Sequence, residues 1–159
     1  MKHKLDREIS NIIRRSKFDN KLLSSKKYVG YSEFLSDRLL MILVIREGVT
    51  YSLFSLIQNL TPFTEQNWAD FLDISTKSLH RYKVNSKSFR PIQSEKIIEM
   101  AEVTKIGLDT FEDMDKFKLW LETPNFSLGS LSPIELLKDS YGKELVVGEL
   151  TRINYGILA

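Results

Sequence analysis

The chain has no cysteine in its 159 residues, so disulfide bonds and thiolate metal sites are excluded. This composition is compatible with a reducing cytoplasm, where we expect the protein to be located. Histidine is almost as scarce. His3 and His80 are the only two, and His80 has no second ligand-type neighbour at metal-binding spacing. We therefore expect no metal and no cofactor.

Long hydrophobic runs are also missing. The longest extends from Leu39 to Ile45 between Arg38 and Arg46, and it is far shorter than the ~20 residues that a helix needs to cross a bilayer. The first residues, MKHKLDREIS, contain no apolar stretch of the secretory-signal type. We expect no membrane association. The hydrophobic fraction of 42% is enough to bury one core or two small ones.

The residue combinations that usually support catalysis are absent as well. The sequence has no evident carboxylate pair, no nucleophile next to a base and no phosphate-binding loop. We expect a non-enzyme with no catalytic residues.

Charge is unevenly distributed along the chain. Residues 1–27 contain nine lysines and arginines against three acidic residues, and residues 77–96 contain six against one. Residues 97–150 reverse the sign, with five basic and eleven acidic side chains. This asymmetry favours a polyanion as partner of the basic regions and a different partner for the acidic one, unless the helix faces differ only by chance.

The hydrophobic pattern predicts an all-α protein. Apolar residues recur with helical spacing, whereas glycines and prolines fall between the segments. Ser132 and Glu135 form a capping-box pattern, and Trp68 and Trp120 lie among apolar neighbours, which is typical of core residues. Residues 24–30 are predicted to form a flexible joint. We expect a basic helix that carries Leu5 and Ile9 and another helix that begins at Pro91. Further helices are expected over 32–47, 50–60, 111–121, 133 to about 141, and from 143 onward.

Residues 68–82, WADFLDISTKSLHRY, have the spacing of a DNA-binding helix-turn-helix. Ala69 provides the small residue that a close helix crossing needs, and Leu79 and Tyr82 would turn the second helix toward the core. Asp73 stands where glycine is usual in the turn, and aspartate tolerates the left-handed conformation better than most residues.

The second helix of this motif carries the candidate DNA contacts. Lys77 and Arg81 are one turn apart, and both can reach a phosphate or a guanine edge. His80 is interpreted as a hydrogen-bond donor to DNA, not as a metal ligand. The full candidate set is Ser75, Thr76, Lys77, Ser78, His80, Arg81, Lys83, Lys87 and Arg90.

The C-terminal third resembles a known family. The pairs that carry the resemblance keep a fixed order, continued by Gly142 and Leu150: Trp120-Leu121, Pro124-Asn125, Leu128-Gly129, Ser132-Pro133, Leu136-Leu137, Arg152-Ile153 and Tyr155-Gly156. This pattern resembles the toxin-binding module of the Xre/MbcA/ParS-type antitoxins, which are partners of RES-domain toxins. The resemblance extends from about Glu47 to Ala159.

The resemblance implies a function. Members of this family form homodimers, bind an operator in front of their own operon, and neutralise an NAD⁺-consuming RES toxin by placing their C-terminal end in its active-site cleft. On this chain the implied plug comprises Arg152, Ile153, Asn154, Tyr155, Gly156, Ile157, Leu158 and Ala159. The implied scaffold comprises Trp120, Leu121, Pro124, Asn125, Leu128, Gly129, Pro133 and Leu137.

The residues themselves allow a distinction within the C-terminal end. No charged side chain follows Arg152, and an apolar terminus is usually docked on the chain itself or on a partner. Leu150 and Ile153 continue the spacing of Leu145 and Val146, which favours internal packing. For residues 155–159 we favour a partner.

We expect three regions: a basic N-terminal extension over 1–30, a dimerisation and helix-turn-helix region over 31–106, and a toxin-binding module over 107–159. The N-terminal extension could be a DNA-binding arm, a dimer contact or a protease-sensitive tail. Two other functions stay open, a transcriptional regulator without a toxin partner and an inhibitor whose helix-turn-helix is only structural.

Overall fold

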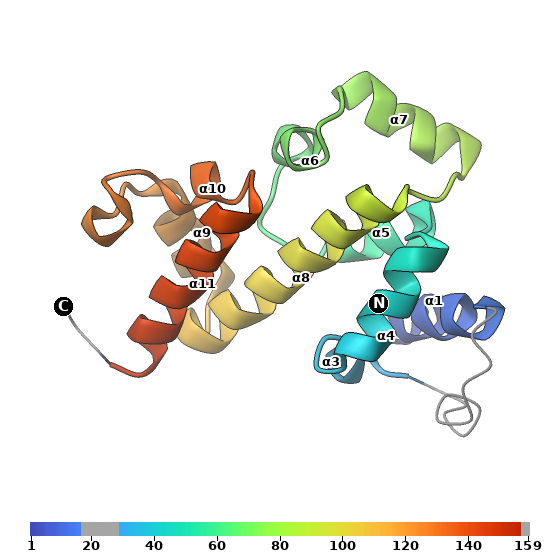
Figure 1. The fold of residues 1–159 in the computed structure, drawn as a ribbon, viewed down its shortest axis with the longest axis horizontal. Helices are drawn as coiled ribbons and strands as arrows, with labels where there is room; N and C mark the ends of the chain where they lie inside the picture. The colour runs from blue at the N-terminus through green and yellow to red at the C-terminus, as the bar shows by residue number, and fades with distance from the viewer. Residues whose placement is uncertain (17–28, 157–159) are drawn as a thin grey trace. The chain divides into compact units, whose positions relative to one another are not determined.

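The computed structural model describes residues 1–16 and 29–156, which fold as α-helices with one short 3-10 helix (Figure 1). No β-strand occurs among these residues, so the all-α prediction is confirmed. Most of the predicted joint over 24–30 lies outside them. The described residues contain no helix long and apolar enough to cross a membrane. They form two compact units, residues 1–60 with 75–99 and residues 61–74 with 100–159.

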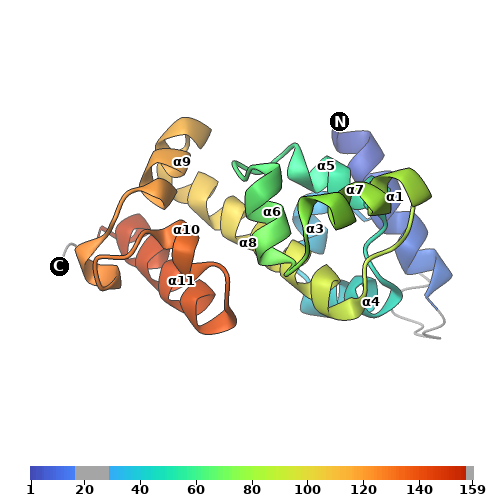
Figure 2. The ribbon, with the colours of Figure 1, turned by 90° about the horizontal axis from the view of Figure 1, so that it is seen from above.

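Helix α1 (Lys2–Arg15) is an integral part of the first unit. It lies against α4 (Arg38–Glu47) and α5 (Tyr51–Gln58) and buries Leu5 and Ile9 completely (Figures 1 and 2). Two buried polar side chains anchor the chain that follows. Asp6 Oδ1 accepts from the backbone N–H of Tyr31 at 2.8 Å, and Ser10 Oγ accepts from that of Val29 at 3.1 Å. Residues 2–15 are therefore folded, not a loose tail.

The predicted helix over 32–47 is wrong in its continuity. The structure has two helices, α3 (Tyr31–Phe34) and α4, separated near Asp37. The Asp37 side chain accepts from the backbone N–H groups of Leu39 and Leu40, so it caps a new helix. Aspartate competes with the backbone for hydrogen bonds, which favours caps over helix interiors. Helix α4 buries Leu40, Leu43 and Val44 and contacts α1.

Aromatic stacking holds α7 (Thr76–Asn85) and the start of α8 (Pro91–Phe111) in the first unit. The ring of Tyr82 stacks on Phe89 with centroids 4.3 Å apart, and Phe54 lies 5.1 Å from Phe89. The hydroxyl of Tyr82 donates to Gln93 at 3.1 Å. Since Leu79 is also buried, one face of α7 is firmly attached to this core.

The second unit begins with α6 (Glu65–Phe71), where Phe63, Trp68 and Phe71 meet edge to face. It continues with the end of α8 and with α9 (Met114–Glu122), η1 (Phe126–Leu128), α10 (Pro133–Leu136) and α11 (Ser140–Asn154). Trp68 is fully buried as predicted, whereas Trp120 is only half-buried and stacks beside Phe117.

Three predicted boundaries in this unit are shifted. Phe111 ends α8, and the next helix begins at Met114, after Glu112 in a left-handed conformation and the capping Asp113. Helix α10 stops at Leu136, well before 141. Helix α11 begins at Ser140, capped by Asp139, and so includes Gly142. A Cβ on Gly142 would lie 1.9 Å from the carbonyl oxygen of Leu136. This glycine therefore serves the close approach of α10 and α11 and does not end a helix.

Candidate functional site

The turn at residues 72–75 ends α6, in the second unit, and leads to α7, in the first. Asp73 is left-handed with φ +51°. The backbone N–H of Ile74 donates to the carbonyl of Ala69, and that of Asp73 donates to Asp70. These two bonds form a Schellman motif, in which glycine usually occupies the left-handed position. The expected conformation of Asp73 is confirmed.

Ser75 and Ser78 stabilise the start of α7. Ser75 Oγ accepts from the backbone N–H of Ser78 at 3.0 Å, and the two hydroxyls are bonded to each other at 3.0 Å. Ser78 is half-buried, whereas Ser75 is exposed. Both hydroxyls already have partners, so they are less available for DNA than the other candidates are.

The other candidates are exposed cations and polar residues. Thr76, Lys77, His80, Arg81 and Lys83 are exposed on α7, and Lys87 and Arg90 are exposed in the segment before α8. Within the described part of the chain, none of the lysines or arginines on α7 forms an ion pair. The outer face of α7 is thus a cationic surface on a rigidly held helix.

Val84 is a residue on this surface that the sequence analysis missed. It is 68% exposed and follows His80 by four positions and Arg81 by three, so it lies on the same helical face. An exposed valine between cations can contact the methyl group of a thymine in the major groove. The sequence signal that could have identified Val84 is that it is apolar in a helix with few apolar residues.

In the C-terminal module, the loop before α10 is organised by Asn125. Its side chain accepts from the backbone N–H of Ser127 at 2.9 Å, and its carbonyl accepts from that of Ser130. Gly129 is left-handed with φ +70°. Of the predicted scaffold, Leu121, Leu128, Pro133 and Leu137 are buried, Trp120 and Asn125 are half-buried, and Pro124 and Gly129 are exposed.

The capping box at α10 is confirmed. The Glu135 carboxylate accepts from the Ser132 hydroxyl at 2.5 Å and from the Ser132 backbone N–H at 3.0 Å. These bonds, the hydroxyl first, lower the pKa of Glu135 below its usual value. The box sets the start of α10 and thereby the approach to α11.

Helix α11 carries the described part of the predicted plug at its end. Leu150 is fully buried and Ile153 half-buried, so these two residues pack within the unit. Asn154, Tyr155 and Gly156 are exposed, with Tyr155 at 74%. The half-buried Arg152 pairs with Glu149 at 2.9 Å. Ile157, Leu158 and Ala159 lie outside the described residues.

The sequence analysis grouped Leu145 with Val146 and Leu150 as a packed set, and for Leu145 this is wrong. Val146 is fully buried, but Leu145 is 56% exposed, because neighbouring residues of a helix point about 100° apart and Leu145 lies outside the covered face of α11. Tyr141, 83% exposed, is on the same outer side. Neither residue was identified from the sequence as a candidate site residue.

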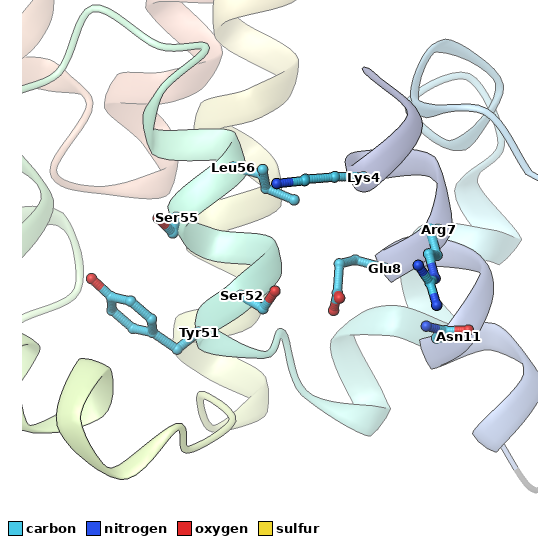
Figure 3. A pocket seen from close by; sticks show the side chains of 8 residues that line it. All are labelled: Lys4, Arg7, Glu8, Asn11, Tyr51, Ser52, Ser55 and Leu56. Carbon is cyan, nitrogen blue, oxygen red and sulfur yellow. The ribbon is translucent and has the colours of Figure 1, made fainter. Parts of the chain in front are cut away.

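A cavity of about 540 Å³ is present in the first unit between α1 and α5 (Figure 3). Lys4 reaches toward Leu56 across it, and Glu8 lies between the two helices. Its lining mixes both charge signs with hydroxyl groups, and Lys4 and Arg7 are exposed, whereas Glu8 is half-buried. No group of three or more potential metal ligands occurs among the described residues.

Comparison with known proteins gives consistent similarities. Residues 107–156 match the family model of the antitoxin Xre/MbcA/ParS C-terminal toxin-binding domain. A protein named antitoxin Xre from Photorhabdus laumondii is 26% identical over 117 residues, which cover 73% of this chain and 79% of that protein. Another protein of that name, from Yersinia enterocolitica, is 31% identical over 87 residues, 54% of this chain and 59% of that protein.

A solved structure shares the fold. The chain matches a chain in the crystal structure of the M. tuberculosis MbcT–MbcA toxin–antitoxin complex, with a TM-score of 0.55 and 20% sequence identity. The match covers 67% of this chain and 94% of that one.

Proposed function

Residues 107–156 belong to the Xre/MbcA/ParS antitoxin family, and on this premise we propose that the chain is the antitoxin of a toxin–antitoxin system. Its partner is a RES-domain toxin that consumes NAD⁺, and the complex forms in the cytoplasm. The family match over the C-terminal module is the observation that carries the proposal. Residues 107–159 act as the toxin-binding module, whereas residues 31–106 dimerise and bind DNA.

Inhibition is steric and requires no chemistry by this chain. Helix α11 is anchored by Val146 and Leu150, which are fully buried, and its C-terminal end projects Tyr155 into solvent. The residues from Arg152 to the C-terminus occupy the active-site cleft of the toxin and exclude NAD⁺ from it. A rigid helix is a suitable mount for such a plug, because little conformational entropy is lost when it docks.

The test is a chain that ends at Asn154, the last residue of α11. Wild type and truncated chain are each coexpressed with the product of the neighbouring reading frame, and cellular NAD⁺ is measured. We expect wild type to preserve NAD⁺ and the truncated chain to lose protection with an unchanged helical circular dichroism spectrum. Full protection by the truncated chain would disprove the plug, and NAD⁺ loss with both chains would disprove the antitoxin function.

The same chain represses its operon through α7. Its exposed cations, Lys77 and Arg81 foremost, are a turn apart on one face of a helix held by Leu79 and Tyr82. A homodimer would present two such helices to half-sites about 34 Å apart, so the operator is an inverted repeat.

Operator binding is tested by titrating DNA from upstream of the operon with Lys77→Ala and Arg81→Ala. Each variant should weaken binding and reduce the slope of log affinity against log salt by about 1. Lys118→Ala is the matched control, because Lys118 is also an exposed helical lysine but on α9. An equal loss of operator affinity in all three variants would contradict the assignment of α7 as the DNA-binding helix. So would unchanged affinity in both α7 variants.

A further inference from the structure

We propose that a stripe along the outer face of α11, comprising Tyr141, Leu145, Gly148, Arg152 and Tyr155, is a docking surface for the body of the toxin. This surface extends beyond the terminal plug, with which it shares Arg152 and Tyr155. The inference rests on the proposed antitoxin function and specifies which face of the module contacts its partner.

The stripe is continuous along the helix. Its members follow one another at intervals of four and three residues, which keeps them on one side of an α-helix. Tyr155 continues the helical course, since its backbone N–H donates to the carbonyl of Thr151 at 3.1 Å. From Tyr141 to Tyr155 the stripe is about 21 Å long.

Its side chains are unusual for a solvent-facing surface. Tyr141, Leu145 and Tyr155 are 83%, 56% and 74% exposed, and the only charge among the five residues is that of Arg152, which is paired with Glu149. Tyrosine and arginine are enriched at protein interfaces and unpaired charges are depleted from their centres. This composition fits a protein surface and does not fit DNA.

Two glycines of α11 show that the stripe is not explained by internal packing. Gly142 is required, because a Cβ there would collide with the backbone of Leu136. At Gly148, by contrast, an added Cβ meets nothing within 4 Å. A glycine within a helix costs about 1 kcal/mol relative to alanine. The fold itself does not require this glycine, and a bare backbone at the centre of the stripe lets a partner approach closely.

The occupant is the toxin. The stripe lies entirely within residues 107–156, the range that matches the toxin-binding domain model, and it leads into the segment proposed as the plug. A toxin bound along α11 would therefore hold the plug in register with its active-site cleft. A second copy of this chain is the other possible occupant, and the experiment separates the two.

The experiment measures affinity for the purified toxin with full-length Leu145→Gln and Gly148→Gln. Both positions are exposed, so Leu145→Gln should leave the thermal midpoint near that of wild type, and Gly148→Gln should not lower it. We expect each variant to weaken the complex at least about tenfold. Leu119→Gln is the matched control, because Leu119 is 67% exposed on α9 of the same unit, and it should change affinity less than about twofold.

Each result has a distinct meaning. Unchanged affinity in both stripe variants, with wild type still bound, would overturn the stripe while the antitoxin function stands. Equal losses in Leu119→Gln would also overturn it. If the variants instead shifted a wild-type dimer to monomer in analytical ultracentrifugation without toxin, the occupant would be a second copy. A wild-type chain that binds no toxin would remove both the function and the stripe.

Discussion

The outer faces of α7 and α11 differ in their chemistry although both helices are anchored in the same way. Each buries leucine or valine on one side, Leu79 in α7 and Val146 with Leu150 in α11. The free side of α7 carries unpaired cations around Val84, whereas that of α11 carries tyrosines and a leucine around Gly148. A cationic face suits a phosphate backbone, and a neutral aromatic face suits a protein.

The largest expected effect tests the two sides of α7. Leu79→Ala should destabilise the fold by about 3 kcal/mol, because Leu79 is buried and its truncation leaves a cavity. Val84→Ala on the outer side should change the free energy of unfolding by less than about 0.5 kcal/mol, yet weaken operator binding by about 1 kcal/mol. Urea denaturation and DNA titration measure the two quantities. Similar stability losses in both variants would contradict the assigned faces.

The next largest effect is expected within α11, where a covered position and an open position are each occupied by glycine. Gly142→Ala should destabilise by about 2 kcal/mol, because the new methyl group overlaps the Leu136 carbonyl and α10 must shift. Gly148→Ala should have the opposite sign and stabilise by about 1 kcal/mol, since the position is open and alanine favours helix. Thermal unfolding shows whether each substitution lowers or raises the stability of the fold. A stability loss in Gly148→Ala would mean that something within the fold needs this glycine.

A smaller effect concerns the turn that leads into α7. Asp73→Gly should raise stability by about 0.5–1 kcal/mol, because glycine adopts the left-handed conformation without steric cost. Asp73→Ala is the control and should not stabilise, since alanine has the same steric conflict. Toxin binding through α11 should be unaffected in both variants. A change of toxin affinity in either Asp73 variant would contradict the assignment of DNA binding to α7 and toxin binding to α11.

The smallest effect is a pH dependence at the start of α10. Glu135 has a pKa below its ordinary value in the folded chain, owing first to the Ser132 hydroxyl. Its carboxylate therefore contributes stability above the unfolded-state pKa, and this contribution is lost as the pH falls through the lower folded-state pKa. Ser132→Ala should reduce the acid-side loss of thermal stability. Identical pH profiles for wild type and variant would show that the hydroxyl does not control this carboxyl.

Local sequence signals predicted the capping box of α10 and the turn before α7. The Ser132–Glu135 box and the left-handed Asp73 depend on hydrogen bonds between residues only a few positions apart. Signals of the same kind would have predicted the break at Asp37, because aspartate before an apolar run favours a new helix start. The C-terminal module was likewise recognisable from its sequence, and the match over residues 107–156 agrees with it.

By itself, the sequence determined that the protein is helical, where the capping box of α10 lies and which family its C-terminal module resembles. Only the tertiary structure decided that Val146 faces inward and Leu145 outward, and that the fold requires Gly142 but not Gly148. The physical reason is that helical spacing determines which residues share a side of a helix, whereas the neighbouring elements determine which side is covered. The neighbours of α11 include η1 and α10, and the backbone of α10 reaches Gly142. The side that carries Tyr141 and Tyr155 is exposed.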